Sequence, residues 1–291
     1  FKNGQFIFSS EIKSIIKKLY IEKKINYNTF KEYLNRGFIS NSNTILNDIY
    51  KLETASELVF DIKNQKIKIK KFWKLNNHKK DLTKYSYKNH IDNIQNLIDE
   101  SVKEQVVADV PIGILLSGGI DSSLITASAS KFLSELNTFN VRFKNYNKYD
   151  ESENAKIISN HFNTKHHEIF ADDIEPDIMI ELSKQFDEPL TDSSMIPTFH
   201  VCKVIKKYFT VALGGDGGDE MFGGYGKYQK AILLKKYISF IPKKFRNIAG
   251  NFSRNHLPLG LKGKNWIETL DQDMNNDEII TSYLFDEITT K

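Results

Sequence analysis

The spacing of hydrophobic positions along this chain changes near residue 90. Before that point, short segments alternate polar and apolar residues, which predicts strands at 5–10 and in a hairpin over 57–73. One segment, 11–20, instead has helical spacing. Residues 76–89 are polar and have no periodicity, so we expect a linker there.

From residue 90 onward, helical and strand patterns alternate. The helix expected at 90–107 has an apolar face formed by Ile91, Ile94, Leu97, Ile98 and Val102. Strands are expected at 110–116, 138–143, 165–170 and 208–213. Helices are expected at 121–134, 151–162, 174–186 and 194–207, and the chain beyond Lys230 reads as helical or irregular. This alternation predicts an α/β fold, an open and mostly parallel sheet with helices on both faces.

The first candidate site directly follows the expected strand at 110–116. Ser117-Gly118-Gly119 reads as a tight turn, and Asp121 lies at the start of the next helix. Free backbone N–H groups converge at such a helix start, where the helix dipole is positive, so the pattern predicts an anion site. The loop is shorter than a Walker A loop and has no lysine, which favours pyrophosphate and cleavage of ATP between its α and β phosphates. A plain helix cap after a turn is the alternative.

A second glycine-rich loop, 211–228, follows the last expected strand. Its glycines surround three acidic residues, Asp216, Asp219 and Glu220. Glycines let the backbone approach a nucleotide closely, and carboxylates can hold Mg²⁺ or position an amine. A glycine-rich turn without function is the alternative. Ligands of such sheets lie at the carboxyl ends of strands, where both loops are expected.

Composition narrows the class of protein. The 291 residues are 40% hydrophobic and 27% charged, as in an ordinary soluble globular protein. A net charge of +4 suits an anionic substrate but does not indicate a nucleic-acid partner. The single cysteine excludes a disulfide framework within the chain, and no apolar run approaches the roughly 18 residues of a membrane span. The chain starts without methionine or a signal peptide, so we expect a piece of a longer polypeptide.

The histidines and the cysteine are weaker candidates for metal ligation and nucleophilic catalysis. His166 and His167 are neighbours on an expected strand and should face opposite sides, which favours structural roles over joint metal ligation with His161. Cys202 lies in a helical pattern with no base placed beside it. A buried packing thiol is therefore favoured over a nucleophile.

The two loops together carry a family resemblance. SGGIDSS (117–123) and LGGDGGDEMFGGY (213–225), separated by FDEPLTDSSMIP (186–197), resemble the C-terminal synthetase domain of glutamine-dependent asparagine synthetases. These enzymes are pyrophosphatase-loop ATP hydrolases. TILNDIYKLETASELVF (44–60) resembles the end of their N-terminal glutaminase domain. The resemblance implies an adenine nucleotide α-hydrolase-like fold over 90–291, incomplete at its C-terminal end, after an α+β remnant of an Ntn-type glutaminase domain over 1–75.

The resemblance also implies residue roles. ATP and pyrophosphate binding falls to Leu115, Leu116, Ser117, Gly118, Gly119, Asp121, Ser122, Ser123, Val141, Gly214 and Gly215. Catalysis falls to Asp216, Asp121 and Asp219. Association with the substrate or Mg²⁺ falls to Asp150, Asp216, Asp219 and Glu220, with Mg²⁺ held through phosphates and by Asp121 and Asp219. Gly214 stands where the family commonly has serine.

The implied reaction is ATP-dependent amidation of aspartate to asparagine through β-aspartyl-AMP, with release of AMP and pyrophosphate. Glutamine hydrolysis supplies the ammonia. The glutaminase nucleophile and the family's late catalytic lysine have no counterpart here, so this chain alone is expected to be inactive. The alternatives are a relative that amidates another carboxylate, such as a polysaccharide sugar acid or an antibiotic precursor, and a truncated binding module. A cytoplasmic homodimer without nucleic-acid or membrane partners is expected.

Overall fold

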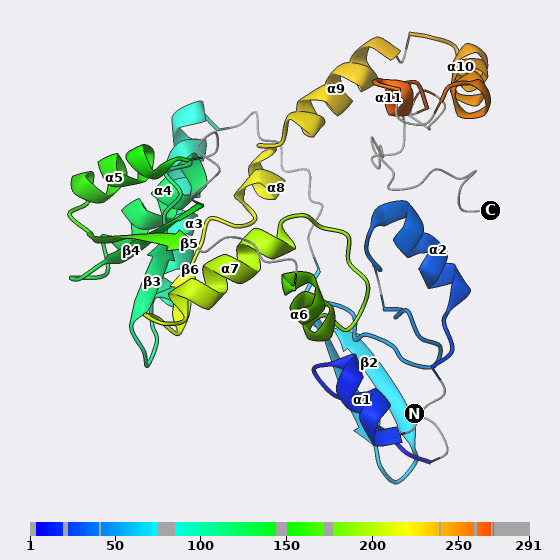
Figure 1. Ribbon diagram of the computed structural model, residues 1–291, viewed down its shortest axis with the longest axis horizontal. Helices are drawn as coiled ribbons and strands as arrows, with labels where there is room; N and C mark the ends of the chain where they lie inside the picture. The colour runs from blue at the N-terminus through cyan, green and yellow to red at the C-terminus, as the bar shows by residue number, and fades with distance from the viewer. Residues whose placement is uncertain are drawn as a thin grey trace. The chain divides into compact units, whose positions relative to one another are not determined.

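The chain divides into two units. The computed structural model describes residues 4–19, 23–40, 42–74, 85–143, 150–171, 177–238, 240–258, 261–268 and 270 (Figure 1). The first unit comprises Phe1–Asn77, Ile180–Asp192 and Gly226–Lys291. The second comprises His78–Met179 and Ser193–Tyr225. The chain therefore passes between the units more than once.

The second unit is built on a parallel sheet. Its four strands are β3 (Ile112–Leu115), β4 (Asn137–Phe143), β5 (Lys165–Ala171) and β6 (Val211–Leu213), in the order β5-β4-β3-β6. Its helices are α3 (Tyr87–Gln105), α4 (Ile120–Ala129), α5 (Ser152–His161), α7 (Met195–Ile205) and α8 (Gly218–Phe222). The predicted α/β fold with a parallel sheet is confirmed.

Packing covers both faces of this sheet. Ile114 on β3 is fully buried in a core with Val102 of α3 and Ala129 of α4. Neighbouring residues of a strand point to opposite faces. Gly113 accordingly lies on the other side, where Phe139 and Phe209 close in, and Phe209 belongs to the turn after α7. The sheet is thus held between α3 and α4 on one face and the end of α7 on the other.

A polar link fixes α4 to α3. Asp99 of α3 accepts hydrogen bonds from Ser128 Oγ of α4 at 2.6 Å and from Lys131 Nζ, just beyond α4, at 2.6 Å. The bonds from Lys131 and then Ser128 hold the pKa of Asp99 below its ordinary value. The carboxylate therefore stays ionised at neutral pH and keeps α4 in place.

The first unit contains a hairpin and several helices. Strands β1 (Ser56–Asp61) and β2 (Lys66–Lys71) pair antiparallel, which confirms the predicted hairpin. The helices are α1 (Ile12–Leu19), α2 (Tyr27–Arg36), α6 (Ile178–Gln185), which begins in the second unit, α9 (Gly226–Ile238), α10 (Lys243–His256) and α11 (Lys264–Glu268). Helix α1 confirms the helix expected at 11–20.

Some local expectations were wrong. Residues 6–10 form no strand, and Phe6 instead stacks on Phe60 of the hairpin with ring centroids 4.5 Å apart. Helix α2 was not expected, although Asn26 caps its start and Gly37 ends it at a φ of 81°. Cys202 is exposed rather than buried. The face of α7 that carries it points to solvent, whereas His200 and Ile205 are buried.

The boundaries also differ in detail. Strand β6 starts three residues later than the strand expected at 208–213, because Tyr208 and Phe209 donate their amides to the Ile205 carbonyl and finish the turn after α7. Most of the expected linker, 75–84, lies outside the described residues, and Ser86 caps α3. Residues 180–192 and 226–291 group by contacts with the N-terminal part of the chain. The sequence analysis had placed all of 90–291 in one domain. That assignment stays a prediction.

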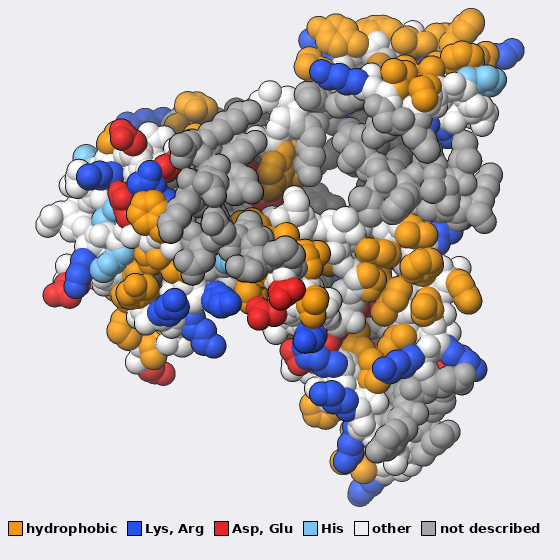
Figure 2. Space-filling model, in the orientation of Figure 1, with side chains coloured by type: hydrophobic (Ala, Val, Ile, Leu, Met, Phe, Trp, Pro, Cys, Tyr) orange, Lys and Arg blue, Asp and Glu red, His pale blue; other side chains and the backbone are white. Residues whose placement is uncertain are grey.

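The surface carries an apolar area on α9 and α10. Figure 2 shows hydrophobic side chains gathered over these helices, at the top of the view. Seven large apolar residues there are more than half exposed: Ile232, Leu233, Tyr237, Phe240, Phe245, Ile248 and Phe252. None of the helices that the structure describes combines the length and apolarity needed to cross a membrane.

Replacing Phe139 tests the sheet core. Its ring is 1% exposed, stacks on His167 at 4.8 Å and meets Phe209 edge-on at 4.9 Å. We expect Phe139→Ala to lower the free energy of unfolding by about 3–5 kcal/mol, because the truncation leaves a cavity. The matched control Phe132→Ala, at a ring 38% exposed, should cost clearly less in the same denaturation measurement. Equal losses would contradict this account of the core.

Candidate functional site

Two glycine-rich loops start side by side at one edge of the sheet. Strands β3 and β6 pair in parallel with Ile114 opposite Leu213, so the chain leaves both strands at the same height. On its other side β3 pairs with β4, which makes β3 the point where the strand order reverses. In open α/β sheets, ligands bind in the crevice at such a point, outside the carboxyl ends of the strands.

The serine hydroxyls of the first loop turn inward. Ser123 Oγ donates to the Gly119 carbonyl at 2.7 Å, and Ser122 Oγ lies 3.2 Å from the same carbonyl and 3.0 Å from Ser117 Oγ. Ser117 Oγ also accepts from the Gly119 amide at 3.2 Å. These bonds brace the loop. The remaining candidates for holding an anion are backbone N–H groups in the first turn of α4, which have no helical partners.

Gly118 is the position where only glycine fits. Its φ of 91° is in the left-handed region, and a β-carbon there would lie 2.6 Å from the Ala155 backbone nitrogen and 2.7 Å from Asn154 Cβ. At Gly119 the φ is −71°, and the nearest atom to an added β-carbon is Ser117 Oγ at 3.3 Å. The loop therefore packs its backbone directly on the start of α5.

Glycines of the second loop pack directly against the first loop. A β-carbon at Gly215 would lie 2.8 Å from both Asp121 Cβ and the Ser122 amide nitrogen. At Gly218 it would lie 2.6–2.9 Å from the Asp121 carboxyl group. The structure thus brings together Asp121, Ser122, Gly215 and Gly218, which are about a hundred residues apart along the chain.

The acidic residues of the second loop lie close to its glycines. The carboxyl group of Asp216 would be 2.8 Å from a β-carbon added at Gly214. Asp219 lies beside Gly224, and Glu220 accepts a hydrogen bond from the Tyr225 hydroxyl at 2.7 Å. Asp216 and Glu220 are exposed and Asp219 is partly buried. Carboxylates of this kind are ordinary ligands of Mg²⁺.

Asn140 supports the first loop and was missed by the sequence analysis. The Leu116 amide donates to the Phe139 carbonyl at 2.8 Å, and the Leu116 carbonyl accepts from Asn140 Nδ2 at 3.0 Å. Asn140 is 6% exposed, and its Oδ1 has no hydrogen-bond partner among the residues that the structure describes. Its signal was an asparagine inside an otherwise strand-forming segment, where this residue type is depleted.

The carboxylate of Asp150 is already engaged. It accepts from the Ser152 amide at 3.0 Å and from Arg142 Nε and Nη2 at 3.0 and 2.5 Å. The bonds from Ser152 and then Arg142 hold the pKa of Asp150 below its ordinary value. Arg142 also approaches Glu168 at 3.5 Å. Leu115 ends β3 beside Phe139, and Val141 lies two residues further along β4.

The neighbouring histidines are bound to β4. His166 Nδ1 lies 2.9 Å from Thr138 Oγ1, and His167 Nε2 lies 3.1 Å from Asn137 Oδ1. Burial is the main cause that lowers the pKa of both imidazoles. Across the described part of the chain, no three residues among His, Cys, Asp and Glu come together as a metal-binding group.

The fold and loops define a class of protein, and similarity defines the family. A parallel sheet with two touching glycine loops at its switch point is the architecture of a nucleotide-binding α/β protein. Residues 93–284 match the family described as asparagine synthase, and residues 1–73 match the glutamine amidotransferase domain. The chain belongs to the asparagine synthase family.

Curated relatives agree with this membership. A putative glutamine-hydrolysing asparagine synthetase of Methanocaldococcus jannaschii is 36% identical over 253 residues, which cover 85% of this chain and 48% of the relative. Asparagine synthetase 1 of Bacillus subtilis is 30% identical over 294 residues, which cover 99% of this chain and 45% of the relative. The chain thus spans about half the length of these relatives.

The fit of Gly118 can be tested by alanine substitution. We expect Gly118→Ala to lower the free energy of unfolding by about 2–3 kcal/mol, because the added methyl strains the backbone and displaces α5. Gly119→Ala, whose added β-carbon would meet only Ser117 Oγ at 3.3 Å and whose φ is ordinary, should lose about 1 kcal/mol as a weaker helix cap. Chemical denaturation of both variants gives the comparison. The reverse order of losses would contradict the loop geometry.

The role of Asn140 predicts a second pair of effects. Asn140→Asp replaces the donor to the Leu116 carbonyl with an oxygen, so two acceptors face each other in a buried site. We expect nucleotide affinity to fall about tenfold, because the end of β3 shifts beneath the loop. Asn137→Asp, at a partly buried position of the same strand, is the control. Calorimetric titration with ATP measures the affinity of both variants. If Asn140→Asp binds ATP as tightly as Asn137→Asp, the role of Asn140 is refuted.

Proposed function

We propose that this chain forms the ATP-dependent part of a glutamine-dependent asparagine synthetase. In the complete protein, the aspartate side-chain carboxylate attacks the α-phosphorus of ATP and displaces pyrophosphate. Ammonia then attacks the acyl carbon of the resulting β-aspartyl-AMP, AMP leaves, and asparagine forms. The observation that carries this proposal is the direct packing of Gly215 and Gly218 against Asp121 at the switch point of the sheet.

The first loop would bind the phosphates through its backbone. Amides in the first turn of α4, together with the Gly118 amide, supply donors and the positive end of the helix dipole. Because serine hydroxyls and Asn140 already brace the loop, these donors are in place before the ligand arrives. Such preorganised donors stabilise negative charge that develops as pyrophosphate departs. Leu115, Leu116 and Val141 would line the adenosine side.

The second loop would serve the acyl group and the incoming amine. Asp216 follows directly on Gly215, so its carboxylate is available near the first loop to orient ammonia and accept a proton. Asp121 and Asp219 are our candidates for holding Mg²⁺, and Glu220 and Asp150 are further candidates for association with the substrate or the ion. Carboxylate oxygens suit this ion, which would neutralise the charge of the phosphates.

The remaining partners follow from this reaction. Residues 1–73 match a glutamine amidotransferase domain, which supports glutamine as the nitrogen source in the complete protein. Nucleic acid and membrane have no part in the proposed reaction. We also propose a cytoplasmic location, where ATP and free amino acids are available, and a homodimer.

Product analysis of the full-length protein tests the proposal. With ATP, aspartate and ammonium ion, we expect equal amounts of AMP, pyrophosphate and asparagine. Asp121→Asn should lower the rate of pyrophosphate release about 100-fold, because the carboxylate that would hold Mg²⁺ is lost. Asp92→Asn removes the same charge at an exposed position of α3 and should leave the rate unchanged.

The products also separate the alternatives. Pyrophosphate release with another carboxylic acid but not with aspartate would overturn aspartate as the substrate and favour a relative that amidates a sugar acid or a precursor molecule. ADP as the product would overturn the whole reaction. Failure of the full-length protein to bind ATP would favour a binding module.

A further inference from the structure

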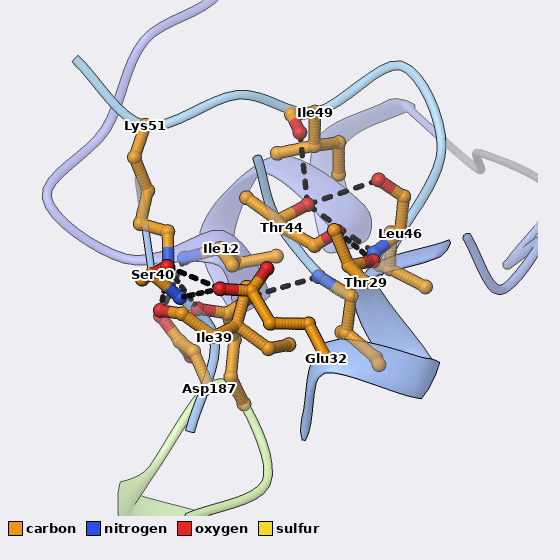
Figure 3. Close-up of polar contacts among 12 residues, drawn as sticks. Ile12, Thr29, Glu32, Ile39, Ser40, Thr44, Leu46, Ile49, Lys51 and Asp187 are labelled. Atoms are coloured by element: carbon orange, nitrogen blue, oxygen red, sulfur yellow. Dashed lines mark hydrogen bonds and ion pairs between the residues drawn. The ribbon is translucent and has the colours of Figure 1, made fainter. Parts of the chain in front are cut away.

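Residues 185–191, here called the clasp, cross from one family segment to the other. By sequence they belong to the part that matches asparagine synthase, residues 93–284. By contacts they lie in the first unit, with the residues that match the glutamine amidotransferase domain (Figure 3). The clasp is therefore a place where the two parts of the chain are physically joined.

Asp187 caps helix α1. Its carboxylate accepts hydrogen bonds from the Ile12 amide at 2.5 Å and the Lys13 amide at 3.3 Å, and it lies 3.8 Å from Lys13 Nζ. The first amides of a helix have no helical partners, and the helix dipole favours a negative charge there. A side chain 175 residues away along the sequence thus supplies the cap of α1.

Glu188 joins two further parts of the same unit. One oxygen of its carboxylate accepts from the Ile45 amide at 2.7 Å, and the other accepts from Lys51 Nζ at 2.7 Å. Lys51 also donates to the Ile39 carbonyl at 3.2 Å. The side chains of both Asp187 and Glu188 are only 17% exposed, so solvent screens these interactions less than it would on an open surface.

The clasp is fastened at its two ends as well. Lys13 Nζ donates to the Gln185 carbonyl at 3.0 Å, which holds the beginning. The Thr191 amide donates to the Gly37 carbonyl at 2.8 Å, and the Tyr33 hydroxyl lies 3.0 Å from Thr191 Oγ1. Two charged side chains in the middle, together with hydrogen bonds to Gln185 and Thr191 at the ends, thus fix the whole clasp to residues 12–51.

The clasp continues directly into the sheet unit. The first unit includes the chain up to Asp192, the second resumes at Ser193, and α7 begins at Met195. Along the chain, α7 thus begins four residues after the clasp ends. Ammonia that escapes into water is protonated and is no longer a nucleophile, so an enzyme that forms ammonia in one part and uses it in another has to keep those parts in register.

We propose that Asp187 and Glu188 are positioning residues that couple glutamine hydrolysis to amidation. This inference rests on the proposed function. The two carboxylates hold the clasp, which belongs to the asparagine synthase match, on the segment that matches the amidotransferase domain. Weakening them leaves each reaction intact but lets ammonia escape before it reaches the acyl group.

The test compares two nitrogen sources in the full-length protein. In Glu188→Gln and Asp187→Asn, pyrophosphate release with ammonium ion should stay at the wild-type rate, because neither residue is placed at the reacting atoms. With glutamine, the glutamate formed per pyrophosphate released should rise about fivefold, the size of a modest coupling free energy. Glu53→Gln is the matched control, since its side chain is 58% exposed and forms a long, 3.7 Å ion pair with Lys71.

Lys51, which donates to Glu188, allows a second test of the same interaction. Lys51→Met should raise the ratio like Glu188→Gln, and the double variant should show little more than either single change, because one interaction is removed in all three. Thermal unfolding of each variant is recorded in parallel. Glu188→Gln keeps an oxygen for the Ile45 amide, so it decides the question where Asp187→Asn fails to fold.

The outcomes distinguish the two proposals. Variants with the wild-type ratio of glutamate to pyrophosphate overturn the coupling role alone. A proportional loss of both rates together with a lower Tm also overturns it, since that result indicates a merely structural contact. A wild-type protein that releases no pyrophosphate with either nitrogen source overturns the proposed function and this inference with it.

Discussion

The parallel pairing of β3 with β6 is the constraint on which the candidate site depends. Because Ile114 lies opposite Leu213, the two loops leave the sheet at the same height and meet without long side chains between them. Gly215 and Gly218 can lie against Asp121 because they have no β-carbons. The strand order β5-β4-β3-β6 reverses at β3, so this meeting point is also where an open α/β sheet offers a crevice.

The first loop is braced by its own serines and by its neighbours α5 and β4. Ser122 and Ser123 direct their hydroxyls to the Gly119 carbonyl, and Gly118 packs on the start of α5. Asn140 holds the carbonyl of Leu116 at the end of β3. The side chains thus shape the loop, while backbone amides are left for the phosphates. Such an arrangement costs little reorganisation when charge develops, which is the condition for electrostatic catalysis.

Local signals predicted the hairpin, the strands of the parallel sheet and the two glycine loops, although they also predicted a strand at 5–10 that does not form. Contacts between residues distant in the sequence were not predicted. Glycine clusters after apolar strands are local, so the loops at Ser117 and Gly214 were predicted correctly in position. The contact of Asn140 with Leu116 depends on the register between two strands, and the bond of Asp187 to Ile12 spans 175 residues. Helix α2 had local signals in Asn26 and Gly37 that a search for apolar periodicity overlooks.

The clasp changes what kind of join connects the two family segments. Two parts that share one flexible linker separate freely, and only the length of the linker limits them. Here the chain returns to the first unit at residues 180–192, where the largely buried carboxylates of Asp187 and Glu188 hold it. It then continues into α7. Release of the clasp from residues 12–51 requires breaking the bonds of Asp187 and Glu188 to α1, Ile45 and Lys51. The join is therefore a folded element with its own stability, and its strength can be tuned by single residues far from either glycine loop.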